Sequence, residues 1–137
     1  MSEDVELTCK VFVDSVWSRD EVTVNIARSL NGTVDSNTIL TPSGEIDVRR
    51  NDDFSERTRF AFPDGFVYFP YVAEFYASPG EGLHGQVASV STVLTNLWDQ
   101  DIPAIAACDF ADQLPNRGGF RNKSVPWARD LAASHRE

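Results

Sequence analysis

Two kinds of hydrophobic periodicity alternate along the chain and predict its elements. Residues 5–13 alternate apolar and polar side chains, which is typical of a strand with one buried face. Ser18 and Glu21 form a capping-box pattern that opens a helix, and this helix is expected to close at Gly32, a favourable residue for a left-handed C-terminus. Apolar residues at three- and four-residue spacing predict a second helix over about 83–98.

The remaining apolar runs predict further strands. An extended region over roughly 37–50 is interrupted by a turn at Pro42-Ser43-Gly44. The runs 58–62 and 66–77 are joined by a segment with the Asp-Gly pair that favours hairpins, so we expect a hairpin there. Residues 102–110 predict a short last strand of small side chains.

The predicted order is strand, helix, strand, strand, helix, strand, which is the ferredoxin-like split β-α-β arrangement. We therefore expect an α+β fold: a four-stranded antiparallel sheet in the order 4-1-3-2, with both helices on one face. Residues 1–116 would form this single domain, and 117–137 a basic C-terminal extension with a short helix at 124–133. Pro70 conflicts with this prediction, because proline inside a central strand requires a bulge or another strand order.

Length and composition narrow the class of protein. The chain has 137 residues, of which 42% are hydrophobic, enough for one globular domain with a core. No apolar run is long enough for a membrane span, and the acidic N-terminus lacks a secretory pattern, so we expect a cytoplasmic protein without a membrane partner. Cys9 and Cys108 are expected on neighbouring strands, as free, buried and inert thiols, since no basic residue lies beside Cys108 to lower its pKa.

Charge is distributed unevenly. The formal net charge is −9, and residues 1–116 hold 19 acidic and 7 basic side chains. Residues 60–116 contain no Lys or Arg at all. Such a surface repels the phosphates of nucleic acids and attracts basic proteins, so we expect a basic protein partner and no nucleic acid.

The predicted topology gathers carboxylates at one end of the molecule. The start of the first strand should lie beside the ends of the third and fourth strands and the start of the second helix. We call this end the acidic pole, and its predicted members are Asp4, Glu6, Glu74, Glu81, Asp109 and Asp112. The acidic pole is interpreted either as a solvated edge or as a docking surface for a cationic partner. The spacing of its carboxylates along the chain matches no metal-binding loop, so no metal is expected.

The sheet face without helices is a second candidate surface. The predicted strand 66–77 is apolar on both faces, and the candidate open-face aromatics are Phe12, Phe66, Tyr68 and Tyr76. Core packing, a homodimer interface, a protein partner or coverage by the C-terminal segment would each explain them. RNA stacking is disfavoured, because the charge is negative and the glycine-aromatic signature of such domains is missing.

Catalytic groups are sparse. His84, in the first turn of the second predicted helix, is either a general base beside the acidic pole or a plain surface residue. The glycines around it do not form a phosphate-binding loop. We predict no catalytic residues and no cofactor.

The segments WDQDIPAIAACDF (98–110) and LPNRGG (114–119) resemble small uncharacterised proteins of high-GC bacteria. In size, acidity and lack of a catalytic set, the whole chain is similar to immunity proteins that neutralise polymorphic bacterial toxins. That resemblance implies a non-enzymatic cytoplasmic module whose carboxylates bind a basic toxin. The alternatives are a small ligand-binding protein or enzyme of the dimeric ferredoxin-like type, and a structural or regulatory subunit.

Overall fold

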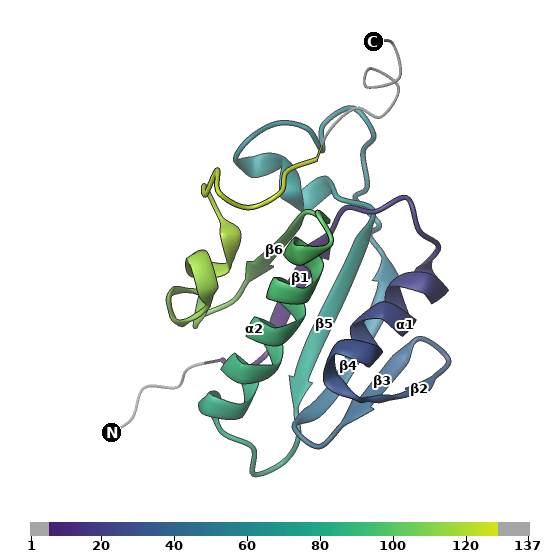
Figure 1. Cartoon of the computed structure of the whole chain (residues 1–137), viewed down its shortest axis with the longest axis vertical. Helices are drawn as coiled ribbons and strands as arrows, with labels where there is room; N and C mark the ends of the chain where they lie inside the picture. Colours follow the sequence, from purple (N-terminus) through teal and green to yellow (C-terminus); the bar gives the residue numbers. More distant parts are fainter. Residues whose placement is uncertain (1–5, 129–137) are drawn as a thin grey trace.

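The computed structural model describes residues 6–128 and contains one antiparallel sheet with two α-helices (Figure 1). The sheet has six strands in the order β2-β3-β4-β5-β1-β6. The strands are β1 (Cys9–Val13), β2 (Thr33–Asp35), β3 (Thr38–Thr41), β4 (Gly44–Arg50), β5 (Tyr71–Ala77) and β6 (Ala104–Ala107), and the helices are α1 (Arg19–Leu30) and α2 (Leu83–Asp99). The mixed α/β class and the antiparallel sheet are confirmed, whereas the predicted number of four strands is wrong.

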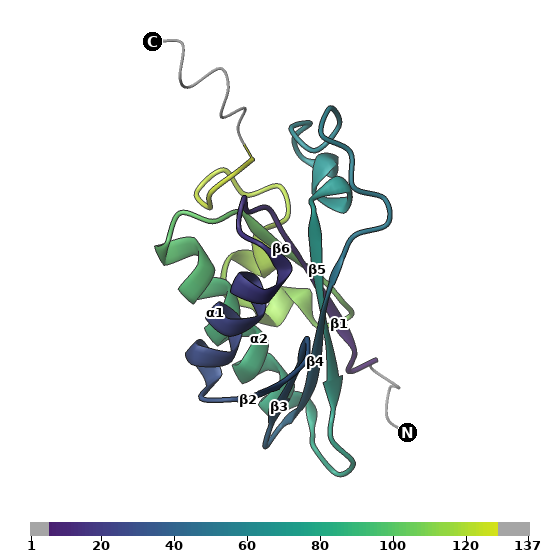
Figure 2. The same ribbon diagram turned by 90° about the vertical axis from the view of Figure 1, so that its right-hand side faces the viewer.

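Both helices pack on the same face of the sheet, as Figure 2 shows. Alternate residues of β1, Cys9, Val11 and Val13, are at most 1% exposed and contact this layer. Val90, Val93, Leu94 and Leu97 supply the matching stripe of α2. The core therefore follows the two periodicities of the sequence, two residues for strands and 3.6 for helices.

The start of α1 confirms the predicted capping box. The Ser18 side chain accepts a hydrogen bond from the Glu21 amide at 3.1 Å, and the Glu21 carboxylate accepts one from the Ser18 amide at 2.8 Å. At the other end, Asn31 rather than Gly32 takes the left-handed conformation, with φ of 54°. Asparagine is the non-glycine residue that best tolerates this region, so the helix ends one residue earlier than expected.

The predicted extended region 37–50 forms two strands, and a third strand precedes it. β2 and β3 form a hairpin that continues the sheet beyond β4. The turn at Pro42-Ser43 leads into Gly44, whose φ is 154°. A Cβ atom on Gly44 would lie 1.9 Å from the Tyr76 carbonyl oxygen, so only glycine lets β4 begin this close to β5.

The predicted hairpin between 58–62 and 66–77 is wrong. Residues 51–70 form a loop that contains a short 3-10 helix, η1 (Asp64–Tyr68), and β5 begins only at Tyr71. The Asn51 side-chain amide closes the loop by donating to the carbonyls of Val67 and Phe69, at 2.7 and 2.8 Å. Pro70 precedes the strand, so its missing N–H removes no hydrogen bond from the sheet and the conflict disappears.

The described part of the C-terminal extension packs against the sheet. Two further 3-10 helices, η2 (Ala111–Gln113) and η3 (Pro115–Gly119), follow β6. Gly119 lies so close to β6 that an added Cβ would be 3.2 Å from the Ala104 carbonyl oxygen. Residues 124–128 are not helical, and the rest of the predicted helix 124–133 lies outside the described residues. No helix in residues 6–128 is long and apolar enough to cross a membrane.

Candidate functional site

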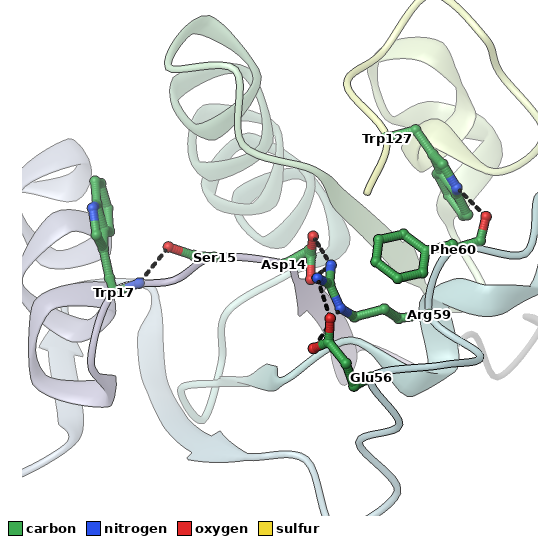
Figure 3. Close-up of polar contacts among 7 residues, drawn as sticks. All are labelled: Asp14, Ser15, Trp17, Glu56, Arg59, Phe60 and Trp127. Carbon is green, nitrogen blue, oxygen red and sulfur yellow. Dashed lines mark hydrogen bonds and ion pairs between the residues drawn. The ribbon is translucent and has the colours of Figure 1, made fainter. Parts of the chain in front are cut away.

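A cleft of about 690 Å³ opens where β1 ends and the chain turns toward α1. Its walls come from the residues that follow β1, the loop 51–70, the turn before β6 and the C-terminal segment. Figure 3 shows polar contacts of several side chains around it. Its lining includes Asp14, Trp17, Arg50, Arg59, Tyr71 and Trp127.

Asp14 and Arg59 form the polar floor of the cleft. One guanidinium nitrogen of Arg59, Nη1, bonds both carboxylate oxygens of Asp14, at 2.7 and 2.8 Å (Figure 3). The opposite side of the guanidinium bonds Glu56, at 3.1 and 3.3 Å. The side chains of Asp14 and Arg59 are 11% and 9% exposed, whereas that of Glu56 is 68% exposed. Arg59 is thus held between a shielded and a solvated carboxylate, with the Phe60 ring centre 4.2 Å from its guanidinium carbon.

Burial shifts the protonation equilibria of this pair. Desolvation raises the pKa of Asp14, and the charge and hydrogen bonds of Arg59 only partly offset that rise. Burial alone would lower the pKa of Arg59, but the hydrogen bonds and charges of Glu56 and Asp14 outweigh it, and the pKa of Arg59 rises. Both oxygens of Asp14 are engaged, so this carboxylate anchors the loop 51–70 more than it serves as an open general base.

Aromatic side chains form the walls of the cleft. The Tyr71 hydroxyl donates to the Trp17 carbonyl oxygen at 2.5 Å, which holds the residues before α1 against β5. The Arg50 guanidinium lies 5.4 Å from the centre of the Tyr71 ring. The Trp127 indole donates to the Phe60 carbonyl oxygen at 2.9 Å (Figure 3). The result is a preformed concave surface with both aromatic and charged groups, which suits binding.

No sequence pattern predicted this cleft. Asp14 directly follows the alternating strand pattern, which is a signal for a functional position at a strand end. Arg59 lies 45 residues away in the chain, in a segment predicted to be a hairpin, so no local pattern joins it to Asp14.

At the predicted acidic pole, the structure brings four of the six carboxylates to one end of the molecule. The Glu6 amide donates to the Asp109 carboxylate at 3.1 Å. The Gln86 side chain, 2% exposed, donates to the Leu7 carbonyl oxygen at 2.8 Å, so the chain before β1 lies against the first turn of α2. Glu81 precedes that turn, and Asp112 lies in η2, just after Asp109.

The other two predicted members of the acidic pole do not join this group. Glu74 lies on the open face of the sheet, where it accepts a hydrogen bond from Arg49 at 2.9 Å and is directly opposite Lys10. Its charge is therefore compensated by Arg49 of β4, a pairing that no sequence spacing reveals. Asp4 lies outside the described residues.

Residues 120–128 and the loop 51–70 cover part of the open face. The Phe12 and Phe66 rings meet edge to face, with centroids 5.4 Å apart, and Phe66 meets Phe120 at 5.7 Å. Phe12 and Phe66 also belong to a second, smaller apolar cluster on this face, with Phe69, Ile105, Ala128, Phe60 and Trp127. Phe12 and Phe66 are thus packed inside the chain, against the loop 51–70 and the C-terminal segment.

The other two open-face aromatics differ in environment. Tyr68 is half-buried within η1. Tyr76 is 41% exposed on the uncovered part of the sheet. Desolvation and the neighbouring carboxylates of Glu74 and Asp47 raise the pKa of Tyr76. An exposed tyrosine among carboxylates is a suitable contact for a basic protein surface.

The remaining candidates carry little chemistry. His84 is exposed in the first turn of α2. Among residues 6–128, no group of three or more His, Cys, Asp or Glu side chains is placed to hold a metal ion. Comparison of the chain with protein-family models, with curated proteins and with solved structures found no match.

Proposed function

We propose that the protein is a non-enzymatic module of the cytoplasm that binds a basic protein, such as a bacterial toxin, through its acidic pole. The observation that carries this proposal is the hydrogen bond from the Glu6 amide to Asp109, which joins the chain before β1 to the end of β6. It places Glu6, Asp109 and Asp112 together, next to the Glu81 end of α2. Residues 60–116, which supply three of these carboxylates, contain no Lys or Arg.

The charges of the acidic pole favour its interpretation as a docking surface over its interpretation as a solvated edge. Carboxylates without an internal cation gain most from a cation that an incoming protein supplies, because the pair is desolvated on docking. Glu74 illustrates the contrast, since Arg49 already satisfies it. The exposed Tyr76 and the acidic side chains on the open face would extend the contact area toward the size of a stable interface.

Affinity capture from the cytosol of the source cells, with the full chain as bait, followed by calorimetry with the purified captured protein, tests the proposal. The double variant Asp109→Asn/Asp112→Asn keeps the acceptor oxygen for the Glu6 amide and removes two charges. We expect its Kd to rise about 10-fold or more. The control Asp52→Asn/Asp53→Asn removes the same charge from the exposed loop after β4 and should change Kd little. Equal Kd values for the wild type and both double variants would refute the proposal.

We propose that β4, β5, β1 and β6, with α1 and α2, form a ferredoxin-like split β-α-β core to which the β2-β3 hairpin is added. The order β4-β5-β1-β6 within the sheet supports this, because it is the 2-3-1-4 order of that fold. The hairpin lies between α1 and β4 in the chain, so it extends the sheet without changing the order of the four core strands.

A second candidate function is small-ligand binding in the cleft beside Asp14. The specific observation is the aromatic wall of Trp17, Tyr71 and Trp127 around a volume suited to a small molecule. Two tryptophans line the cleft, so binding should change the intrinsic fluorescence. Titration with a set of aromatic fragments should give a saturable change that Trp17→Phe reduces; its absence for every fragment would exclude this candidate.

A further inference from the structure

Cys9 and Cys108 occupy facing positions on two neighbouring strands. The register of β1 with β6 pairs Lys10 with Ala107, and one step further along the same antiparallel register places Cys9 opposite Cys108. Both side chains belong to the helix-covered face, where Cys108 packs against the cluster that contains Cys9. The two thiol groups lie close enough for each to shift the pKa of the other.

This geometry matches that of a disulfide. Directly opposite residues of an antiparallel pair have Cα atoms about 4.5–5.5 Å apart, and disulfides join Cα atoms about 4.4–6.8 Å apart. Both cysteines are free in the structure. They are also the chain's only cysteines, so neither has another partner within the chain.

We propose that Cys9 and Cys108 are a redox modification site that takes a low-molecular-weight disulfide, such as oxidised glutathione, as its oxidant. Cys108 is the attacking residue because its side chain is only partly buried, whereas Cys9 is 1% exposed. Cys9 is the resolving residue, since the register of β1 with β6 places it directly opposite Cys108.

The protonation of the pair supports these roles. The hydrogen bond from Cys9 lowers the pKa of Cys108, although burial and the charges of Asp109 and Asp112 oppose this. The same contact with Cys108, together with burial, raises the pKa of Cys9. A neighbouring thiol thus takes the place of the basic residue that the sequence lacks beside Cys108.

The reaction proceeds by two thiol–disulfide exchanges. The Cys108 thiolate attacks one sulfur of the oxidant, forming a mixed disulfide and breaking the oxidant's S–S bond; the released thiolate takes a proton from water. Cys9 then loses its proton to water, and its thiolate attacks the Cys108 sulfur, forming the Cys9–Cys108 bond and releasing the second thiolate. That thiolate takes up from water the equivalent of the proton that Cys108 lost when it ionised. Two protein thiols are oxidised, and one small disulfide is reduced to two thiols.

The bond would join β1 to the end of β6, beside the contact between Glu6 and Asp109. It closes a loop that contains most of the chain, from residue 9 to residue 108. Cross-links of long loops restrict the unfolded chain most, so the oxidised protein should have the higher Tm.

The test is incubation of the full chain with oxidised glutathione, followed by alkylation and intact-mass measurement. We expect the wild type to lose two hydrogens, about 2 Da, to retain no glutathione and to gain Tm. Cys9→Ser should keep glutathione on Cys108 as a stable adduct, because the resolving thiol is missing. Cys108→Ser should react at least about 10-fold more slowly, because Cys9 is buried.

Three outcomes would overturn the proposal. They are a wild type that keeps glutathione without forming the internal bond, a Cys108→Ser variant that reacts as fast as the wild type, and a wild type that stays reduced under oxidation. Circular dichroism of each variant, under reducing conditions, establishes that it is folded before the comparison. A denatured wild-type sample, in which the two thiols are no longer held together, should give mostly the mixed adduct.

Discussion

Arg59 binds both carboxylate oxygens of Asp14 from 45 residues away in the chain, and in doing so attaches the loop 51–70 to the end of β1. Its other side is held by Glu56, three residues before it. This pair forms the floor of the cleft and also fixes one cover of the open face. The stability of the protein and the shapes of the cleft and of the covered part of the open face therefore depend on this pair.

Substitution of Arg59 and substitution of Asp14 should destabilise the protein by different amounts. Arg59→Met leaves the Asp14 charge shielded without a counter-ion, and we expect a loss of about 3–5 kcal/mol in the free energy of unfolding. Asp14→Asn leaves Arg59 paired with Glu56, so its loss should be clearly smaller. Urea denaturation of both variants and of the double variant checks this; equal losses for the two single variants would show that burial of the charge is not the cause.

Stability should also depend on pH through Asp14. Its pKa is higher in the folded protein than the ordinary value of 3.8, so the folded state holds the proton more tightly than the unfolded chain. Protonation therefore favours folding, and this contribution is lost as pH rises through the folded-state pKa. Relative to Asp14→Asn, the wild type should gain stability as pH falls from neutrality toward 3.8. Urea titrations of both proteins across that range measure the difference. If the wild type instead loses stability relative to Asp14→Asn, folding lowers the pKa of Asp14 and the prediction is wrong.

The cover over the open face predicts the effect of truncating Trp127. Its ring packs against Phe62 and Phe69, and its indole donates to the Phe60 carbonyl oxygen. Trp127→Ala should lose about 2 kcal/mol of stability and raise the binding of an apolar dye, because Phe69 and the residues around it become accessible. Phe120→Ala is the matched control, since Phe120 is already 41% exposed and should lose less than about 1 kcal/mol. Equal losses of stability for the two variants would show that Trp127 is not the residue that protects this cluster.

The sequence predicted those parts of the fold whose signals are local. The capping box at Ser18 and the apolar stripe of α2 each act within a few residues, so propensity and periodicity suffice to locate the helices. The strand pattern of β1 is equally local, and its alternation correctly placed Val11 and Val13 in the core.

The loop 51–70 could not be predicted for the opposite reason. The Asp-Gly pair that favours a hairpin is used here for close packing, since a Cβ on Gly65 would lie 2.7 Å from the Thr58 carbonyl oxygen. The bonds that shape the loop come from Asp14 and from Asn51, which pairs with residues 16 and 18 positions away. Tertiary contacts of this kind override local turn chemistry.

The acidic pole was predicted from topology alone, and this explains its partial accuracy. Strand order brings Glu6 to Asp109, because the antiparallel pairing of β1 with β6 fixes which ends meet. The same argument fails for Glu74, since strand direction does not say which face a carboxylate lies on or whether a base lies beside it. Arg49 is 25 residues away on the adjacent strand, and only the register of β4 with β5 reveals the pair.

If the acidic pole docks a basic protein, salt should act on association more than on dissociation. Raising the ionic strength from about 0.1 M to about 1 M shortens the Debye length from about 10 Å to about 3 Å, which removes the long-range attraction that guides encounter. Contacts already formed at the interface are shielded from ions and should respond less. Stopped-flow measurement with the captured partner should therefore show an association rate that falls steeply with salt and a dissociation rate that changes little.

The charge variants separate steering by the acidic pole from steering by net charge. Asp109→Asn/Asp112→Asn should reduce the salt dependence of association and also speed dissociation, because desolvated carboxylate pairs are lost. Together the two substitutions should cost about 2 kcal/mol or more of binding free energy, which agrees with a rise in Kd of about 10-fold or more. Asp52→Asn/Asp53→Asn carries the same net charge but should keep the wild-type dissociation rate, since those exposed side chains lie in the loop after β4. An identical response of the two double variants would mean that overall charge alone guides the partner, and the acidic pole would then be a solvated edge.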